Sequence, residues 1–244
     1  MELFIQQLIN GITVGAVYAL IALGYTMVYG ILELINFAHG EIYMLGAYLG
    51  IIVLGFFTVI GLTAFSLPLA LFLTIIAAGV ICAAYGATME KIAYRPLREA
   101  PRLAPLISAM GVSIFLQNYV MLTQGANDKV FPHIIPKKSV MVAGAEVTYI
   151  QIFIIAASVI MMAGLHFFIM KTKMGRAMRA TALDKKMAGL MGVNIDSVIS
   201  TTFILGSFLA AVAGVMVAMY YGLVNFYIGY LAGIKAFTAG CWAG

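Results

Sequence analysis

Five long stretches of this chain contain no Asp, Glu, Lys, Arg or His. They are residues 3–32, 42–89, 103–127, 147–165 and 197–234. A helix that crosses the hydrocarbon core of a bilayer needs about 20 mostly apolar residues, and the second stretch holds two such helices, divided by the Gly, Thr, Ser and Pro residues of 61–68. The sequence therefore predicts six membrane spans, at about residues 5–30, 42–61, 68–89, 104–123, 149–170 and 198–221.

The composition excludes a soluble domain. Hydrophobic residues make up 64% of the chain and charged residues only 9%, whereas a soluble domain has about 25% charged residues. The stretches are too long and too uniformly apolar for the alternating strands of an outer-membrane barrel. We expect an all-α integral membrane protein, a polytopic helix bundle that forms a single transmembrane domain over residues 1–244 in a cell inner membrane.

Most of the basic residues lie in two connections between spans. One connection holds Lys91, Arg95, Arg98 and Arg102, and the other holds Lys171, Lys173, Arg176, Arg179, Lys185 and Lys186. Lys and Arg concentrate on cytoplasmic loops of membrane proteins, so the net charge of +5 indicates topology, and nucleic acid is not an expected partner. Both connections are predicted to be cytoplasmic, which places the N-terminus, residues 124–148 and everything after about residue 222 outside.

Two places near or within the spans carry polar groups that suggest function. The segment 33–41 contains Asn36, His39 and Glu41, and ionisable groups at membrane depth are functional candidates because they are costly to bury. Two interpretations stay open: a cytoplasmic turn that Asn36 caps, or a broken helix end that enters the bundle and lines a pathway. Gln117 and Asn118, in the fourth predicted span, either hydrogen-bond across the bundle or line that pathway.

The connection 171–196 is longer than a simple link between spans requires. Its Ala, Met, Leu and Lys content predicts a helix from about Arg176 to Leu190, ended by Gly192 and Asn194. Composition alone leaves two interpretations equally open, a docking surface for a partner and an amphipathic helix on lipid headgroups.

Motifs of nucleotide-binding and hydrolytic enzymes are absent from the sequence. There is no phosphate-binding loop, no dinucleotide fingerprint, no zinc-protease motif and no serine-hydrolase motif. His133 and His166 have no partner at ligand spacing, so no metal site is expected. Small residues at helix-packing spacing occur at Gly11 and Gly15 and at Gly46 and Gly50.

Several strings resemble one transporter family. They are Val28–Tyr48, the run Gly-Arg-Ala-Met-Arg-Ala from residue 175, Met187–Asn194, Phe208–Gly214 and Tyr227–Thr238. In this order they are similar to the permeases of branched-chain amino acid ABC transporters, the LivH type, and the resemblance extends from residue 1 to about residue 239.

The resemblance implies a non-enzymatic permease subunit of an ATP-driven importer for leucine, isoleucine and valine. It implies as partners a homologous second permease, two cytoplasmic ATPases that bind the ATP, and a periplasmic or extracellular amino-acid-binding protein, so no cofactor is expected on this chain. By analogy the ATPase docks on the segment 171–196, at Gly175, Arg176, Arg179, Asp184, Ala188, Gly189 and Gly192.

The main alternative is an ion-coupled secondary amino-acid carrier, and a membrane enzyme is a third possibility. Such a carrier should have a buried acid within a span, and none of the six predicted spans has one in its interior. An enzyme should have a cluster of catalytic groups, which the sequence does not reveal.

The last residues depart from the family pattern. After Thr238 that pattern continues Ala-Ala-Val-Leu-Gly-Gly and leads into further spans, whereas this chain reads Ala-Gly-Cys-Trp-Ala-Gly. Deletion of one nucleotide after the first Ala codon converts one string into the other. We therefore expect that residues 240–244 come from a shifted frame and that C-terminal spans are missing, with a naturally short variant as the alternative.

Overall fold

The computed structural model describes residues 2–32, 36–98, 100–101, 103–132, 139–142 and 145–243. For residues 2, 140, 142, 145 and 240–243 it describes the backbone alone. The predictions about His133 and about the frame of residues 240–244 concern groups outside this set.

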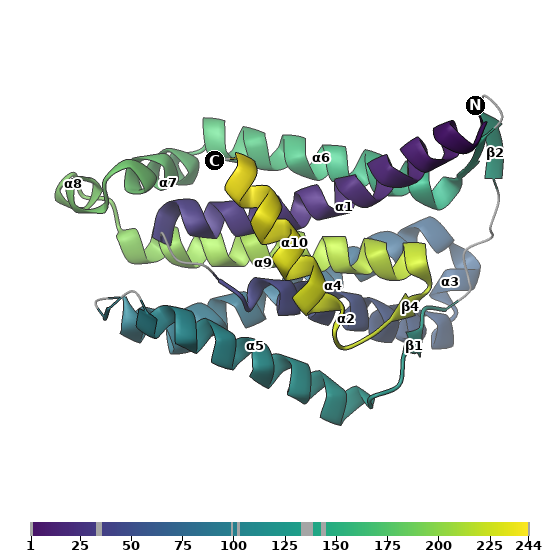
Figure 1. The fold of residues 1–244 in the computed structure, drawn as a ribbon, viewed down its shortest axis with the longest axis horizontal. Coiled ribbons are helices and arrows are strands. Elements are labelled where there is room, and N and C mark those ends of the chain that lie inside the picture. Colours follow the sequence, from purple (N-terminus) through teal and green to yellow (C-terminus); the bar gives the residue numbers. More distant parts are fainter. Residues whose placement is uncertain are drawn as a thin grey trace.

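Ten helices and four short strands make up the described part (Figure 1). The helices are α1 (Glu2–Leu32), α2 (His39–Val59), α3 (Leu62–Phe65), α4 (Leu67–Met89), α5 (Leu103–Gln124), α6 (Tyr149–Lys171), α7 (Lys173–Leu183), α8 (Lys185–Leu190), α9 (Ile195–Tyr221) and α10 (Ile228–Ala243), with a π-helix η1 (Glu90–Tyr94) and a 3₁₀ turn η2 (Arg95–Leu97) after α4. Strand β1 (Lys129–Val130) pairs antiparallel with β4 (Leu223–Val224), and β2 (Ser139–Val142) with β3 (Ala145–Thr148).

Within the described residues, six helices are long and apolar enough to cross a membrane. They cover residues 3–32, 39–59, 67–97, 103–124, 149–171 and 195–221, which confirms the six predicted spans and the all-helical membrane fold. The turn expected at 61–68 is also present. There Gly61 has a φ of +82°, a conformation that glycine adopts at no steric cost, and Pro68 lies in the first turn of α4.

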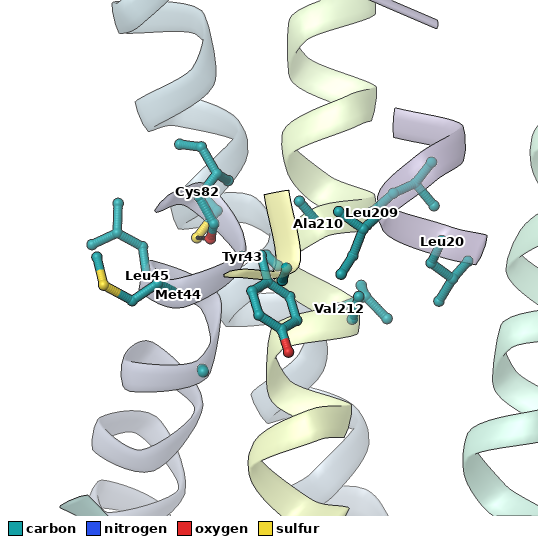
Figure 2. Packing of buried hydrophobic residues seen from close by; sticks show 14 of the residues in the cluster. Leu20, Tyr43, Met44, Leu45, Cys82, Leu209, Ala210 and Val212 are labelled. Atoms are coloured by element: carbon teal, nitrogen blue, oxygen red, sulfur yellow. Dashed lines mark hydrogen bonds between the residues drawn. The ribbon is translucent and has the colours of Figure 1, made fainter. Parts of the chain in front are cut away.

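Helix α9 forms the centre of the bundle. In its most apolar window 83% of the residues are buried, against at most 50% in any other span. The run Ala210–Gly214 is completely or almost completely buried, and its small side chains let α1, α2 and α4 pack around α9. Figure 2 shows Leu209, Ala210 and Val212 of α9 beside Tyr43 of α2, with Leu20 of α1 nearby.

Helices α2 and α9 cross in close contact. A Cβ atom added to Gly46 would overlap the Ala211 backbone, and one added to Gly214 would overlap the Tyr43 carbonyl oxygen. The glycine pair at 46 and 50 is thus a packing motif, as its spacing suggested. For Gly11 and Gly15, by contrast, no described atom lies within 4 Å of the added Cβ.

Both basic connections lie at the same end of the bundle, as predicted. Arg95 of η2 forms an ion pair with Asp196, in the first turn of α9, and α7 and α8 extend beyond this end, opposite the N-terminus (Figure 1). Which side of the membrane this end faces stays a prediction.

The prediction that the chain stays outside after about residue 222 is wrong for α10. This helix crosses the bundle obliquely (Figure 1), where Phe237 contacts Tyr25 of α1 with ring centroids 5.7 Å apart. Its 16 residues are fewer than the about 20 of a complete span, so a length criterion does not detect it.

Candidate functional site

The first turns of α2 lie inside the bundle. Residues 39–48 are all buried, and Asn36 just before them is 3% exposed. The Asn36 side-chain oxygen accepts hydrogen bonds from the Ala38 N–H (3.1 Å) and the Tyr94 hydroxyl (2.6 Å). Asn36 therefore does stabilise the turn before α2, but in a buried position, which favours the interpretation as a helix end that enters the bundle.

Glu41 is completely buried, and only one of its two carboxylate oxygens has hydrogen-bond partners among the described residues. Its Oε1 accepts hydrogen bonds from Ser113 Oγ (3.0 Å) and Gln117 Nε2 (2.7 Å), both on α5. Its Oε2 has no hydrogen-bond partner among the described residues. The expectation that no span has a buried acid in its interior did not take Glu41 into account. Glu41 is a buried acid in the first turn of α2, which begins at His39, three residues before the charge-free stretch.

His39 lies between α1 and α9. A Cβ on Gly24 would come within 2.8 Å of His39 Nε2, and a Cβ on Gly206 within 3.5 Å of its Cε1. The ring meets Tyr25 edge to face at 5.8 Å, and Nε2 has no hydrogen-bond partner within the described part of the chain. Two glycines thus make the space that this imidazole occupies.

Of the two amides predicted in the fourth span, only Gln117 reaches this cluster. Asn118 is exposed on the outer face of α5 and donates to the Ile114 carbonyl of its own helix (2.8 Å). The structure thus places Gln117 and Ser113 against Glu41 and Tyr94 against Asn36, whereas His39 lies between α1 and α9.

Helix α10 covers the Glu41 carboxylate. A Cβ on Gly229 would lie 2.6 Å from Glu41 Oε2 and 2.6 Å from the Gly40 carbonyl oxygen, and one on Gly233 would contact Gly40 at 3.4 Å. Only glycines permit so close a contact between the two helices. Gly222, with φ +72°, ends α9 and precedes the strand and turn that lead into α10.

An ion-pair network joins the two basic connections. Buried Glu90 pairs with Arg98, and Arg98 and Arg95 both pair with Asp196. The second oxygen of Glu90 accepts from Ser200 Oγ at 2.7 Å. Sequence alone did not identify Asp196 as a partner of these arginines, because it lies 98 residues from Arg98 and 101 residues from Arg95. Glu90, by contrast, lies only eight residues from Arg98.

The segment 171–196 folds as two helices and not as the single predicted one. The break falls at Asp184, whose backbone is extended and whose side chain accepts from the Lys186 and Met187 N–H groups. An Asp at this position favours a helix start, so the sequence contained the signal. Gly192, with φ +83°, follows α8 as a helix-ending glycine.

The predicted docking residues divide by exposure. Arg176, Arg179, Asp184, Gly189 and Gly192 are exposed, while Gly175 and Ala188 are buried. A Cβ on Gly175 would overlap the Ile169 backbone, so this glycine sets the angle between α6 and α7. The large apolar side chains exposed on this segment are Leu183, Met187, Leu190 and Met191, and none of them is among the predicted docking residues.

A cavity of about 660 Å³ opens at the other end of the bundle. It lies between residues 130–132, the β2–β3 hairpin, the start of α6 and the end of α9. Its polar lining includes Glu146, Gln151 and Tyr221, and Gln151 is held in place by a 2.8 Å hydrogen bond to Asn10. No motif in the sequence predicted this cavity, because its residues come from four separate segments.

Comparisons with known proteins give a consistent result. The family described as "Branched-chain amino acid transport system / permease component" matches residues 7–244. The chain is 48% identical to the high-affinity branched-chain amino acid transport system permease protein BraD of Pseudomonas aeruginosa, and 48% identical to LivH of Escherichia coli K12. In both cases 99% of this chain and 79% of the relative are covered. A probable branched-chain amino acid transport permease of Methanocaldococcus jannaschii is 26% identical over 80% of this chain and 60% of its own length. No solved structure matches the chain significantly.

Proposed function

This chain belongs to the family of permease components of branched-chain amino acid transport systems, and we propose that it is the membrane-spanning permease subunit of an ATP-driven importer for leucine, isoleucine and valine. The translocation pathway would form between this chain and a homologous second permease. Two cytoplasmic ATPases would bind the ATP, and a periplasmic or extracellular binding protein would deliver the amino acid.

The observation that carries the ABC-type proposal is the form of the segment 171–196. A short connection would suffice between α6 and α9, yet α7 and α8 project beyond the bundle (Figure 1) and expose Leu183, Leu190 and Met191 at 82–90%. Several large apolar side chains exposed on one projecting segment are typical of an interaction surface. We assign this surface to an ATPase, because the chain itself has no phosphate-binding loop.

The buried groups around Glu41 support a pathway at the start of α2. In membrane transporters, discontinuous helices place polar groups near the midplane of the bilayer. The cavity at the opposite end offers an entrance on the side where the binding protein would release its ligand. Rigid-body movement of the docked helices would then open the pathway to one side at a time.

Transport assays test this proposal. Vesicles that contain the chain with the gene products of its neighbours should take up labelled leucine only when ATP is supplied, and the ATPases should co-purify with it. Loss of ATP dependence, or purification without an ATPase, would contradict the proposal.

Glu41 gives a specific reason to test a second candidate. A buried acid within a span is expected of an ion-coupled carrier, and α2 contains one. In that case an ionophore that dissipates the proton gradient should stop uptake, whereas vanadate should not. The family membership favours the opposite result for both reagents.

A further inference from the structure

The Glu41 carboxylate lacks a counter-charge. The residue is 0% exposed, and within the described residues no Lys, Arg or His forms an ion pair with it. A buried carboxylate without a cationic partner is strongly disfavoured. Ser113 and Gln117 fix Oε1, so the oxygen left without a partner, Oε2, has a defined position.

The surroundings of Oε2 can open without unfolding the bundle. It faces Gly229 at the start of α10, whereas the other oxygen of the carboxylate, Oε1, is bound to α5. Helix α10 packs on α1 and α2 and crosses the bundle obliquely (Figure 1), and its glycines leave no side chain interlocked where it meets Gly40. A shift of α10 would therefore expose Oε2 while Oε1 stays bound to α5.

We propose that Glu41 Oε2 binds the ammonium group of the transported amino acid and that α10 covers this site when no substrate is bound. The inference rests on the proposed function, because it takes an amino acid as the substrate. An ammonium group donates hydrogen bonds and carries a positive charge, which would supply the counter-charge missing beside the Glu41 carboxylate. A charge-assisted hydrogen bond is about twice as strong as a neutral one. The carboxylate of the substrate would be repelled from this position.

The first experiment replaces the charge and keeps the shape. Glu41→Gln retains an oxygen that accepts from Ser113 and Gln117, and it should lower leucine uptake by the complete transporter at least tenfold. Glu41→Asp keeps the charge and should retain more uptake than Glu41→Gln. As a matched control, Asp128→Asn removes an exposed carboxylate at the other end and should change uptake less than twofold.

The second experiment measures binding and does not depend on how the variants fold. L-photo-leucine, which carries a diazirine, is crosslinked to the wild-type transporter in membranes washed free of binding protein. Labelled peptides should map to the start of α2, the Ser113–Gln117 face of α5 and the start of α10. Leucinol, which keeps the ammonium group, should reduce labelling at least fivefold, whereas 4-methylpentanoate, which lacks it, should not.

The outcomes separate this inference from the proposed function. If the wild-type transporter does not take up leucine, the proposed function fails. If the wild type transports and Glu41→Gln assembles and transports equally well, only the ammonium site is refuted. Equal competition by 4-methylpentanoate and leucinol, or labelling confined to other helices, also refutes it, even if Glu41→Gln fails to assemble.

Discussion

The Tyr94 hydroxyl donates a 2.6 Å hydrogen bond to the Asn36 side chain, and both residues are buried. Tyr94 is the last residue of the π-helix η1, whose first residue, Glu90, binds Arg98. Arg98 also pairs with Asp196, which is the last residue of the segment 171–196 and lies in the first turn of α9. Two ion pairs, the helix η1 and the Tyr94–Asn36 hydrogen bond therefore connect the proposed ATPase-docking segment to the start of α2, and such networks can carry coupling between sites.

Removal of the Tyr94 hydroxyl tests this connection. Tyr94→Phe keeps the ring packed against Phe203, whose centroid lies 5.3 Å away, but leaves the Asn36 oxygen with one donor fewer. We expect leucine uptake per ATP hydrolysed to fall several-fold, because the lost buried hydrogen bond is worth about 1 kcal/mol. Tyr29→Phe, at an exposed position of α1, is the control, and an unchanged ratio in Tyr94→Phe would refute the connection.

Loss of one partner of the Glu90–Arg98 ion pair should destabilise the protein more than loss of both partners. Arg98→Met alone leaves a buried carboxylate unpaired and should cost about 3–5 kcal/mol, whereas the double variant with Glu90→Gln should recover part of this loss. Arg95→Met, at a half-exposed pair, should cost about 0–1 kcal/mol. Thermal unfolding in detergent measures all three, and equal losses for Arg98→Met and Arg95→Met would contradict the prediction.

The two small-residue motifs should respond differently to one methyl group. Gly46→Ala and Gly214→Ala force apart the α2–α9 crossing, and overpacking typically costs about 1–3 kcal/mol. Gly11→Ala and Gly15→Ala introduce a methyl group where no described atom lies within 4 Å, so the higher helix propensity of alanine should leave stability unchanged or slightly higher. Melting temperatures of the four purified variants decide; similar losses in both pairs would contradict the packing described here.

The sequence predicted most of the fold because hydrophobic length determines which segments can cross a bilayer. The six spans follow from that rule, and so does the turn at 61–68. Helix α10 does not follow from that rule, because it is shorter than a span. The start of α2 does not follow either, because it includes His39 and Glu41, which a search for charge-free stretches excludes. The helix break at Asp184 was also missed, because average helix propensity over 176–190 hides one N-cap residue.

The candidate site was also predictable only in part, because local sequence does not determine which distant residues pack together. Asn36, His39 and Glu41 are close in sequence and polar in an apolar context, so they could be identified from local sequence. Which distant residues meet them depends on packing. Gln117 and Asn118 are adjacent and chemically alike, yet only the rotation of α5 decides that Gln117 reaches Glu41 while Asn118 does not. The same holds for Ser113 and Tyr94, which no sequence pattern indicated.

The orientation in the membrane remains a prediction, and single cysteines test it. In a background without Cys82 and Cys241, a cysteine at Arg176 should be protected from an impermeant thiol reagent in intact cells. A cysteine at Gly125, just after α5 at the other end, should be labelled. Labelling at 176 and protection at 125 would reverse the topology, and permeabilised cells control for reactivity because both sites should then be labelled.

The proposed docking segment gives the sharpest contrast between two adjacent residues. Gly189 is exposed, and a Cβ there would meet only the flexible end of the Ile195 side chain, at 3.2 Å from Cδ1. Gly189→Trp should therefore leave the chain folded and inserted but block the close contact with the ATPase, and uptake should fall at least tenfold. Ala188 is 5% exposed, so Ala188→Glu buries a charge and should instead lower the melting temperature of the isolated chain. Gly11 is exposed in the N-terminal part of α1, away from α8, and Gly11→Trp controls for the bulk of the new side chain. Co-purification of the ATPases gives the decisive measurement: Gly189→Trp should lose them with an unchanged melting temperature, and if it retains both the ATPases and wild-type uptake, α8 is a surface helix that does not dock.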